Sequence, residues 1–427
     1  MGTTSSTAIN ENQTGGKYLG SGTHGCVFSP NMKCKPSDKS TDDFVSKLIL
    51  KSSQKEEYDN IVAFNFNRLD PNSELFVYPS ELCNITKEYI DKDYKRCDKF
   101  IDNLTGRPIS VSDISKKYAN IVQANGGPDM MQLQYNKTLF RQTIGEYDNK
   151  VILHFLNLFI GVAVFEKNKL AHRDIKPANV TVHNVKLMRL IDFGFTAKYV
   201  DNLFKELKSE GGPWDWAHEK YMYWPRDLQL IMSEECGGKY DDIQYLIRDT
   251  DQNKIFTVLT EQASRIKEEC YESYWILNPK QNKNLFTSLL SFLIDLHTKD
   301  LIKTEVDKRV ISHIIQSKWD VFMLGATLSE FISKTKWTSD SPKFDEMFID
   351  LIIDMTSLHP LKRPTIKEAL ERFIKIIFDE ETQTMDGLSD DGLDENIHVL
   401  FKKIMDEELT DILDDGSEND TEYESES

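Results

Sequence analysis

Two short polar motifs constrain the fold of this chain more than any other feature. The first reads HRDIKPANV and places a carboxylate, an ammonium group and a carboxamide at Asp174, Lys176 and Asn179. The second reads IDFGF and adds a carboxylate at Asp192, thirteen residues after the carboxamide. Short apolar stretches flank both motifs, which predicts loops held between short strands. The order and spacing of these groups favour a reactive site over a chance grouping.

A glycine-rich stretch near the start of the chain is the second notable pattern. The segment LGSGTHGCVF has the spacing G-x-G-x-x-G. This spacing is weak evidence by itself, because it also occurs in ordinary turns. Glycine does, however, let backbone N–H groups approach a phosphate closely. The predicted cradle for phosphate consists of Gly20, Ser21, Gly22, Thr23, His24 and Gly25, and the following Cys26 is also predicted to bind the nucleotide.

The third notable pattern is a lysine in the predicted strand FVSKLI. Lys47 stands between apolar neighbours, so we expect its ammonium group to be enclosed and to need a partner. Glu57 is the predicted partner, because it puts apolar residues four and seven positions further on the same helical face. Glu56 is the alternative.

These groups together supply what phosphoryl transfer from ATP requires. That reaction needs a backbone cradle, a cation on the phosphates, metal-binding oxygen atoms and a base near the acceptor hydroxyl. Asp174 is the predicted base, and Lys176 is predicted to neutralise the transferring phosphate. Asn179 and Asp192 offer the hard oxygen ligands that suit Mg²⁺, with Mn²⁺ as an alternative. Val27 is predicted to cover the adenine ring.

From 17 to 378 the sequence resembles the eukaryotic-type protein kinases. The segment KWDVFMLGATL resembles the buried helix of that family whose aspartate, here Asp320, braces the catalytic loop. The segment HPLKRPTIKEAL resembles the closing region, with Arg363 as its buried arginine. Lys176 follows the serine/threonine pattern rather than the tyrosine pattern. The stretches GCVFSP, FVSKL and YWP are similar to kinases of large nucleocytoplasmic DNA viruses.

The resemblance implies a serine/threonine protein kinase that transfers the γ-phosphate of ATP to protein hydroxyls with Mg²⁺. Its implied catalytic residues are Asp174, Lys176, Lys47 and Glu57. The implied fold is α+β and bilobal: a small β-rich lobe and a larger, mainly helical lobe. The expected ranges are a small lobe over 17–135 with an insertion at 84–127, and a large lobe over 136–378 with an insertion at 228–317.

The local patterns predict several elements. Helical spacing predicts one helix over 53–69 and a long buried helix over 149–168. Strand-like patterns predict strands over 74–82 and 129–135. The leader, 1–16, and the tail, 379–427, are predicted to be disordered, except for a transient or docked helix over 397–412.

The sequence also departs from the family. The family's A-P-E motif reads YWPRD here, so Asp227 takes the place of the glutamate that pairs with Arg363. Lys220 stands where the usual substrate-loop threonine is expected, which puts the acceptor pocket in doubt. A scaffold without activity is one rival reading, but the chain keeps the lysine, both aspartates and the asparagine. A kinase of small molecules or lipids is the other, and Arg173 argues against it. Arg173 also predicts control by phosphorylation, because a buried arginine beside the base attracts an anion.

Charge is concentrated at the C-terminal end. The formal net charge is −18, and 379–427 holds 19 acidic residues against two lysines. The remaining chain is therefore close to neutral, which argues against a general nucleic-acid binder. The expected partners are protein substrates, with the acidic tail available to a basic partner.

Cysteine usage and apolar runs bear on location. The six cysteines are widely spaced without a C-x-x-C pair, which predicts reduced thiols, no zinc site and a cytoplasmic protein, in the host cell and the virion if the chain is viral. The longest apolar run, 151–165, is too short to span a membrane. The start, MGTTSS, fits both a myristoylated Gly2 with weak membrane contact and a polar leader, and the short pattern favours the leader.

Overall fold

The computed structural model describes most of the expected kinase-like region. The described residues are 16–22, 25–54, 58–90, 92–102, 105–145, 150–183, 187–201, 203, 223–225, 305–357 and 359–378. The chain is mixed α/β and forms two compact units. The first comprises Met1–Ser73, Val77–Gly126 and Asp192–Gly194, and the second comprises Glu74–Phe76, Gly127–Ile191 and Phe195–Ser427. The predictions for the leader and for the tail with its 397–412 helix lie outside the described residues.

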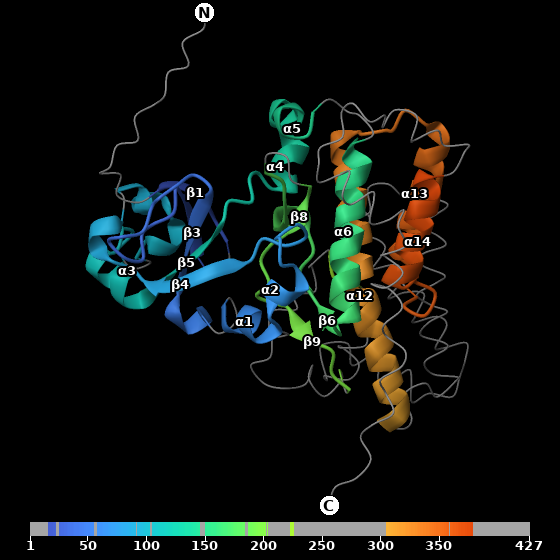
Figure 1. The fold of residues 1–427 in the computed structure, drawn as a ribbon, viewed down its shortest axis with the longest axis horizontal. Helices are drawn as coiled ribbons and strands as arrows, with labels where there is room; N and C mark the ends of the chain where they lie inside the picture. The colour runs from blue at the N-terminus through green and yellow to red at the C-terminus, as the bar shows by residue number, and fades with distance from the viewer. Residues whose placement is uncertain are drawn as a thin grey trace, which may run out of the picture. The chain divides into compact units, whose positions relative to one another are not determined.

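The first unit is built on a five-stranded antiparallel sheet in the order β1-β2-β3-β5-β4 (Figure 1). Its strands are β1 (Lys17–Ser21), β2 (Gly25–Ser29), β3 (Phe44–Leu50), β4 (Pro79–Asn84) and β5 (Tyr118–Ala124). In the register, Val27 lies opposite Lys47, and Lys47 lies opposite Ile121. Directly opposed side chains share a face of the sheet, so these three residues lie on one face. Their neighbours in sequence, including Cys26, lie on the other.

A segment from 85 to 117 covers the Cys26 face of the sheet. It consists of short helices: η3 (Lys87–Tyr89), η4 (Lys92–Arg96), η5 (Asp98–Phe100) and α3 (Val111–Lys117). Tyr94, Phe100 and Ile114 from this segment form one buried cluster with Phe28 and Leu48 of the sheet. The segment therefore gives this face of the sheet a hydrophobic core of its own.

The prediction that an insertion runs over 84–127 is wrong at its end. Strand β5 falls inside that range and pairs with both β3 and β4. Polar residues hid this strand in the sequence. One of them, Asn120, is buried and donates from Nδ2 to the Met32 carbonyl at 3.3 Å. The segment between β4 and β5 is limited to 85–117.

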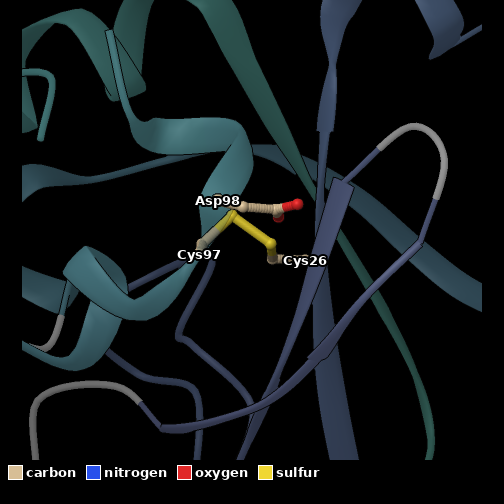
Figure 2. A group of neighbouring side chains, drawn as sticks. All are labelled: Cys26, Cys97 and Asp98. Atoms are coloured by element: carbon tan, nitrogen blue, oxygen red, sulfur yellow. A yellow bond between two sulfur atoms is a disulfide. The ribbon is translucent and has the colours of Figure 1, made fainter. Parts of the chain in front are cut away.

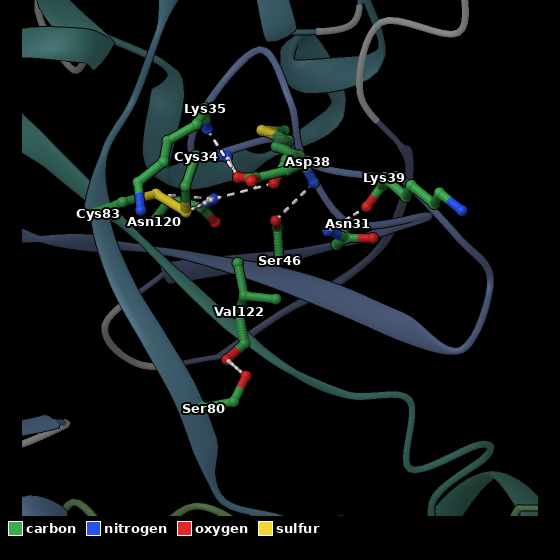
Figure 3. Close-up of a disulfide and its surroundings, with 11 residues drawn as sticks. Asn31, Cys34, Lys35, Asp38, Lys39, Ser46, Ser80, Cys83, Asn120 and Val122 are labelled. Atoms are coloured by element: carbon green, nitrogen blue, oxygen red, sulfur yellow. Dashed lines mark hydrogen bonds between the residues drawn. A yellow bond between two sulfur atoms is a disulfide. The ribbon is translucent and has the colours of Figure 1, made fainter. Parts of the chain in front are cut away.

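Two disulfides fasten the same region. Cys26 on β2 is bonded to Cys97, which lies between η4 and η5, and both residues are fully buried (Figure 2). Cys34 is bonded to Cys83 on β4, with the Asn120 amide beside the bridge, its Nδ2 3.6 Å from the Cys83 sulfur (Figure 3). The prediction of reduced thiols is therefore wrong for these four cysteines. Disulfides persist in oxidising surroundings, and the cytoplasmic location stays a prediction.

Three further local predictions need correction. The helix predicted over 53–69 is broken at Asn65, whose φ of 54° lies in the left-handed region, into α1 (Asn60–Phe64) and α2 (Phe66–Leu69). The strand predicted over 129–135 is instead helix α4 (Met130–Tyr135), because the Asp129 side chain caps its first turn by accepting from the Gln132 N–H. The strand predicted over 74–82 begins only at Pro79.

The described part of the second unit is mainly helical. Among the described residues its α-helices besides α4 are α5 (Lys137–Thr143), α6 (Lys150–Lys167), α12 (Glu305–Thr335), α13 (Pro342–Met355) and α14 (Ile366–Ile377). Phe155 of α6 packs in the core against Phe331, Trp337 and Phe348, with ring centroids 5.6–5.7 Å apart. Helix α12 begins at Glu305, so the end of the insertion predicted over 228–317 is helical. The described helices include none that combines the length and apolar character needed to cross a membrane.

Two pairs of short strands hold the loops of the second unit. They are β6 (Leu170–Ala171) with β9 (Ala197–Lys198), and β7 (Val180–Thr181) with β8 (Arg189–Leu190). These strands flank the motifs HRDIKPANV and IDFGF, as the sequence predicted. A polar side chain inside α6 fixes this region further. Asn157 donates from Nδ2 to the carbonyls of Glu74 at 2.9 Å and of Met188, just before β8, at 2.8 Å.

A half-buried acid on α6 makes stability depend on pH. Burial raises the pKa of Glu166 from 4.5 to about 7, although Lys169 and Lys318 act in the opposite direction. Because the folded pKa exceeds the unfolded one, ionising this carboxyl destabilises the fold as the pH rises from about 4.5 to 7. We therefore expect Glu166→Gln to raise the free energy of unfolding by about 2–3 kcal/mol more at pH 8 than at pH 5.

Urea unfolding at the two pH values measures this difference. The exposed Glu346 of α13 provides the control, since Glu346→Gln should change stability equally at both. A Glu166→Gln effect independent of pH would contradict the burial of an ionising carboxyl.

Candidate functional site

The loop after β6 brings three of the predicted residues together. The Asp174 side chain is buried, and its carboxylate accepts from the Lys176 ammonium group at 2.9 and 3.1 Å. It also accepts from Asn179 Nδ2 at 2.7 Å. The same nitrogen donates to the Asp174 carbonyl at 2.8 Å, so the carboxamide fixes both the backbone and the side chain of this residue. The result is a carboxylate held by charge-assisted bonds in one orientation.

A carboxylate on α12 anchors the backbone of this loop. Asp320 accepts from the backbone N–H of His172 at 2.6 Å and from that of Arg173 at 2.9 Å. Arg173 has a φ of 64°, a conformation that is costly for a residue with a side chain. The two hydrogen bonds stabilise this backbone, as the resemblance predicted for Asp320. Burial raises the pKa of Asp320, and the nearby His172 and the bonds from the loop oppose that shift.

Backbone bonds connect this loop to the second motif. Asn179 ends the short helix η6 (Pro177–Asn179), and its carbonyl accepts from the N–H of Ile191 at 3.0 Å. The carbonyl of Ile191 in turn lies 3.1 Å from Nε2 of His172. Ile191 directly precedes Asp192. The start of the second motif is therefore fixed to the first motif through both the N–H and the carbonyl of Ile191.

In the first unit, Lys47 contacts Asp192. The ammonium nitrogen lies 3.4 Å from Asp192 Oδ1, and the side chains are 12% and 34% exposed. Asp192 adopts a φ of 65°, and the adjacent Phe193 is buried against Phe66 with ring centroids 4.5 Å apart. Lys47 is therefore enclosed, as predicted, and it is paired with Asp192, which was not the predicted partner. Its predicted partner Glu57 and the alternative Glu56 lie outside the described residues.

The glycine-rich stretch forms the turn between β1 and β2. The Gly22 N–H donates to the Gly25 carbonyl at 2.8 Å, and the residues between them, Thr23 and His24, lie outside the described residues. A Cβ on Gly25 would stand 1.9 Å from the Leu48 carbonyl oxygen, so the packing of β2 on β3 requires this glycine. A Cβ on Gly20 or Gly22 would meet nothing within 4 Å, so packing does not explain those two.

Two of the residues predicted to bind nucleotide have side chains on opposite faces of the sheet. Val27 shares a face with Lys47, which suits its predicted role. The side chain of Cys26 turns to the other face, where it is bonded to Cys97 (Figure 2). Only the backbone of Cys26 can therefore take part in binding a nucleotide on the Lys47 face. Its side chain cannot, because it lies on the opposite face. Asp98 beside the bridge does not make a metal site either, because a disulfide sulfur is not a thiolate ligand.

Other residues near the loop were not foreseen in these roles. Gln316 of α12 contacts the Arg173 side chain, and Trp224 contacts the Arg173 backbone. Nothing local marks Gln316, whose partners Arg173 and Val200 lie more than a hundred positions away. Arg363 is buried, as predicted, and donates to the carbonyls of Ser357 and Lys318. Its predicted partner, Asp227, lies outside the described residues.

Comparison with known proteins supports a protein kinase in general. No family model matches the chain. A segment of 98 residues is 29% identical to the calcium/calmodulin-dependent protein kinase kinase cmkC of Emericella nidulans, which covers 22% of this chain. The match spans only 17% of the length of that protein. Over this segment the chain is similar to a protein kinase, and the activity of the whole relative does not carry over with it.

Proposed function

We propose that this chain is a serine/threonine protein kinase, which transfers the γ-phosphate of ATP to protein hydroxyls. The observation that carries the proposal is the buried Asp174 carboxylate, fixed by Lys176 and Asn179 within 2.9 Å. A base must be aimed at the acceptor hydroxyl, and this carboxylate is held in a single orientation by two donors. The same two donors are those that the kinase pattern places after the base.

The predicted nucleotide-binding residues fit ATP by their chemistry. Lys47 is an enclosed cation suited to phosphate, and Gly20 and Gly22 lack a packing reason to be glycine. Backbone N–H groups that can approach closely are what a phosphate needs. Gly20, Ser21, Gly22, Thr23, His24 and Gly25 are the proposed cradle, and Val27 the proposed contact to the adenine ring.

The donor set also fits a magnesium ion. Asp192 offers a carboxylate and Asn179 an amide oxygen, which are hard ligands that suit Mg²⁺. The Asn179 nitrogen already donates to Asp174, which orients the amide with its oxygen as the ligating atom. We propose that Asn179 and Asp192 hold the metal, which when bound would neutralise charge on the phosphates. Mn²⁺ would satisfy the same donors.

In this mechanism each residue has one task. Asp174 orients the acceptor hydroxyl and accepts its proton. Lys176, 2.9 Å from that carboxylate, neutralises charge on the transferring phosphate. Lys47 binds the phosphates of the nucleotide, and Asp320 keeps the base in place through the loop backbone. Positioning and electrostatic stabilisation of this kind supply most of the rate enhancement in phosphoryl transfer.

Three finer points belong to the same proposal. Lys176 two residues after the base is the basis for serine/threonine rather than tyrosine specificity. The two compact units correspond in the proposal to the lobes of a kinase fold. The relationship to kinases of large DNA viruses rests on the short stretches GCVFSP, FVSKL and YWP and stays a prediction.

Transfer from labelled ATP to a mixture of acidic and basic proteins tests the proposal. The full chain with Mg²⁺ should label proteins, and mass spectrometry should place the phosphate on serine and threonine. We expect Lys47→Ala to lower the rate by about 10²-fold, because the cation on the phosphates is lost. The exposed Lys51 directly after β3 gives the matched control, and Lys51→Ala should keep the full rate.

Two results would contradict the proposal. The first is an absence of transfer by the unmodified chain, which would favour a binding scaffold. The second is label on tyrosine alone, which would overturn the assigned specificity.

A further inference from the structure

Two carboxylates lie beside the bond between Cys34 and Cys83. The Cys34 sulfur, one carboxylate oxygen of Asp38 and one of Glu81 lie within 4.8 Å of one another. The Cys83 sulfur is bonded to that of Cys34. All four residues are partly exposed, so a small solute can reach them. Two sulfur atoms and two carboxylates therefore gather at one accessible place in the first unit, which we call the Cys34 cluster.

Two segments of the chain bring these groups together. Glu81 and Cys83 stand two positions apart on β4, so their side chains share a face of the sheet. Cys34 and Asp38 belong to the connection between β2 and β3. There, Asp38 Oδ2 accepts from the N–H of Cys34 at 3.0 Å and from that of Lys35 at 2.7 Å (Figure 3). These bonds hold the carboxylate next to the Cys34 sulfur and engage one of its two oxygens, so the other can bind an ion.

The buried amide of Asn120 is directed at both sulfur atoms. Asn120 is 1% exposed and lies opposite Cys83 in the pairing of β4 with β5. Its Nδ2 lies 3.6 Å from the Cys83 sulfur and 3.9 Å from the Cys34 sulfur, besides its bond to the Met32 carbonyl. A disulfide sulfur accepts hydrogen bonds weakly, whereas a thiolate accepts charge-assisted ones. An N–H group aimed at two sulfurs is therefore the outer-shell contact that a pair of metal-bound thiolates needs.

We propose that the Cys34 cluster binds Zn²⁺ when its S–S bond is reduced. A dithiol reductant gives two electrons to this bond, which breaks into two thiols, and the reductant closes into a disulfide. Zn²⁺ then replaces the two thiol protons, which pass to water. Zinc takes cysteine sulfur and carboxylate oxygen in four-coordinate sites, and soft thiolates favour it over Mg²⁺ or Ca²⁺. The two sulfurs and two carboxylates of the cluster supply that number of ligands.

The other disulfide lacks these features. Cys26 and Cys97 are fully buried, and among the described residues the carboxylate that joins their group is that of Asp98 alone. Reduction there would leave three donors, two of them without access from solvent. The proposal is therefore specific to the Cys34 cluster, and Asp98 provides a matched control.

Zinc at the Cys34 cluster would keep the same parts of the first unit joined in reducing surroundings. The S–S bond ties the connection between β2 and β3 to β4, and an ion on the same residues would tie them likewise. Disulfides are rare in reducing compartments, where clustered cysteines more often bind metal. The sequence predicted no zinc site because a C-x-x-C pair is missing, yet these two cysteines stand 49 positions apart. The inference goes beyond the proposed function and does not depend on it.

The zinc content of the full chain in two redox states tests this inference. One sample is reduced and the other keeps its disulfides, as peptide mapping verifies. Both are incubated with Zn²⁺, desalted and analysed for bound metal. We expect about one Zn²⁺ per reduced chain and none per oxidised chain. In the reduced chain, Zn²⁺ should also slow the alkylation of Cys34 and Cys83. Both readouts use the unmodified chain, so they decide the matter without any activity and even if a variant does not fold.

Two variants and a control locate the ion. Competition with a coloured chelator measures the affinity of each reduced chain for Zn²⁺. Cys34→Ser should weaken binding by about 10²-fold or more, because a direct ligand is lost and even outer-shell changes cost about 10–100-fold. Glu81→Gln, at a partly exposed position, should weaken it by at least about 10-fold. Asp98→Asn should keep the wild-type affinity.

Several results would overturn the inference. A reduced chain that retains no zinc would do so, and so would equal amounts of zinc in the oxidised and reduced chains. Zinc that binds without slowing the alkylation of Cys34 and Cys83 would place the ion at other ligands. Wild-type affinity in both Cys34→Ser and Glu81→Gln would lead to the same conclusion.

Discussion

Replacing Asp174 by asparagine is expected to lower the rate of phosphate transfer by about 10²–10⁴-fold. Asparagine has nearly the same size and can still accept a bond from Lys176 or Asn179, which now lie 2.9 and 2.7 Å from the carboxylate. It cannot accept the proton of a hydroxyl. The change therefore removes the proposed base while the backbone stays anchored by Asp320. The loss should appear in kcat, with the KM for ATP changed little.

Steady-state rates at saturating ATP, together with thermal unfolding, measure this effect. Asp340→Asn is the matched control, since Asp340 is exposed in the same unit and should keep the full rate. If Asp174→Asn retained the wild-type kcat, another group would have to serve as the base. A large fall in the unfolding temperature would instead show that Asp174 acts mainly as a structural partner of Lys176 and Asn179.

The second large effect concerns the bond between Cys26 and Cys97. Its partners are 71 residues apart in sequence, so opening it frees a long loop in the unfolded chain. The loop-entropy relation gives a loss of about 4 kcal/mol in the free energy of unfolding for Cys97→Ser. The loss should fall on the first unit, because both cysteines and the cluster around them belong to it.

Urea unfolding of the oxidised chain and of Cys97→Ser gives this difference directly. Peptide mapping without reductant should first recover the pairs Cys26–Cys97 and Cys34–Cys83. Wild-type protein under strong reductant should lose at least as much stability as the variant, since both bridges then open. Equal unfolding midpoints for the oxidised chain and the variant would show that the 85–117 segment holds to the sheet without the bond.

The sequence was most informative where chemistry depends on local spacing. Asp174, Lys176 and Asn179 lie within six positions, and the loop that carries them brings them into mutual contact. Lys47 was predicted to need a partner because it stands between apolar neighbours, but the predicted partner was Glu57, and its contact with Asp192 comes from the structure. The roles of these residues in catalysis remain proposals, and their arrangement is what the structure contributes.

Elements that depend on distant partners could not be predicted. Strand β5 has the polar residues Asn120 and Gln123, and only its pairing with β3 and β4 makes it a strand. Helix α4 was mistaken for a strand because its apolar residues also alternate, and the cap at Asp129 decides between the two. The disulfides join cysteines without a recognisable spacing, so composition alone pointed to free thiols. Gln316 gains its contacts only in the folded chain.

The alternation of side chains along β2 has an evolutionary consequence. Cys26 and Val27 are neighbours in sequence, yet one joins the covalent and apolar support of the 85–117 segment and the other shares a face with Lys47. A single strand therefore carries two traits that mutation can alter independently. Drift on the supported face would change how well the protein withstands heat or reductant. Under the proposed function, drift on the lysine face would change which nucleotides the protein accepts. A lineage can therefore adapt to heat or reductant while its proposed chemistry is preserved.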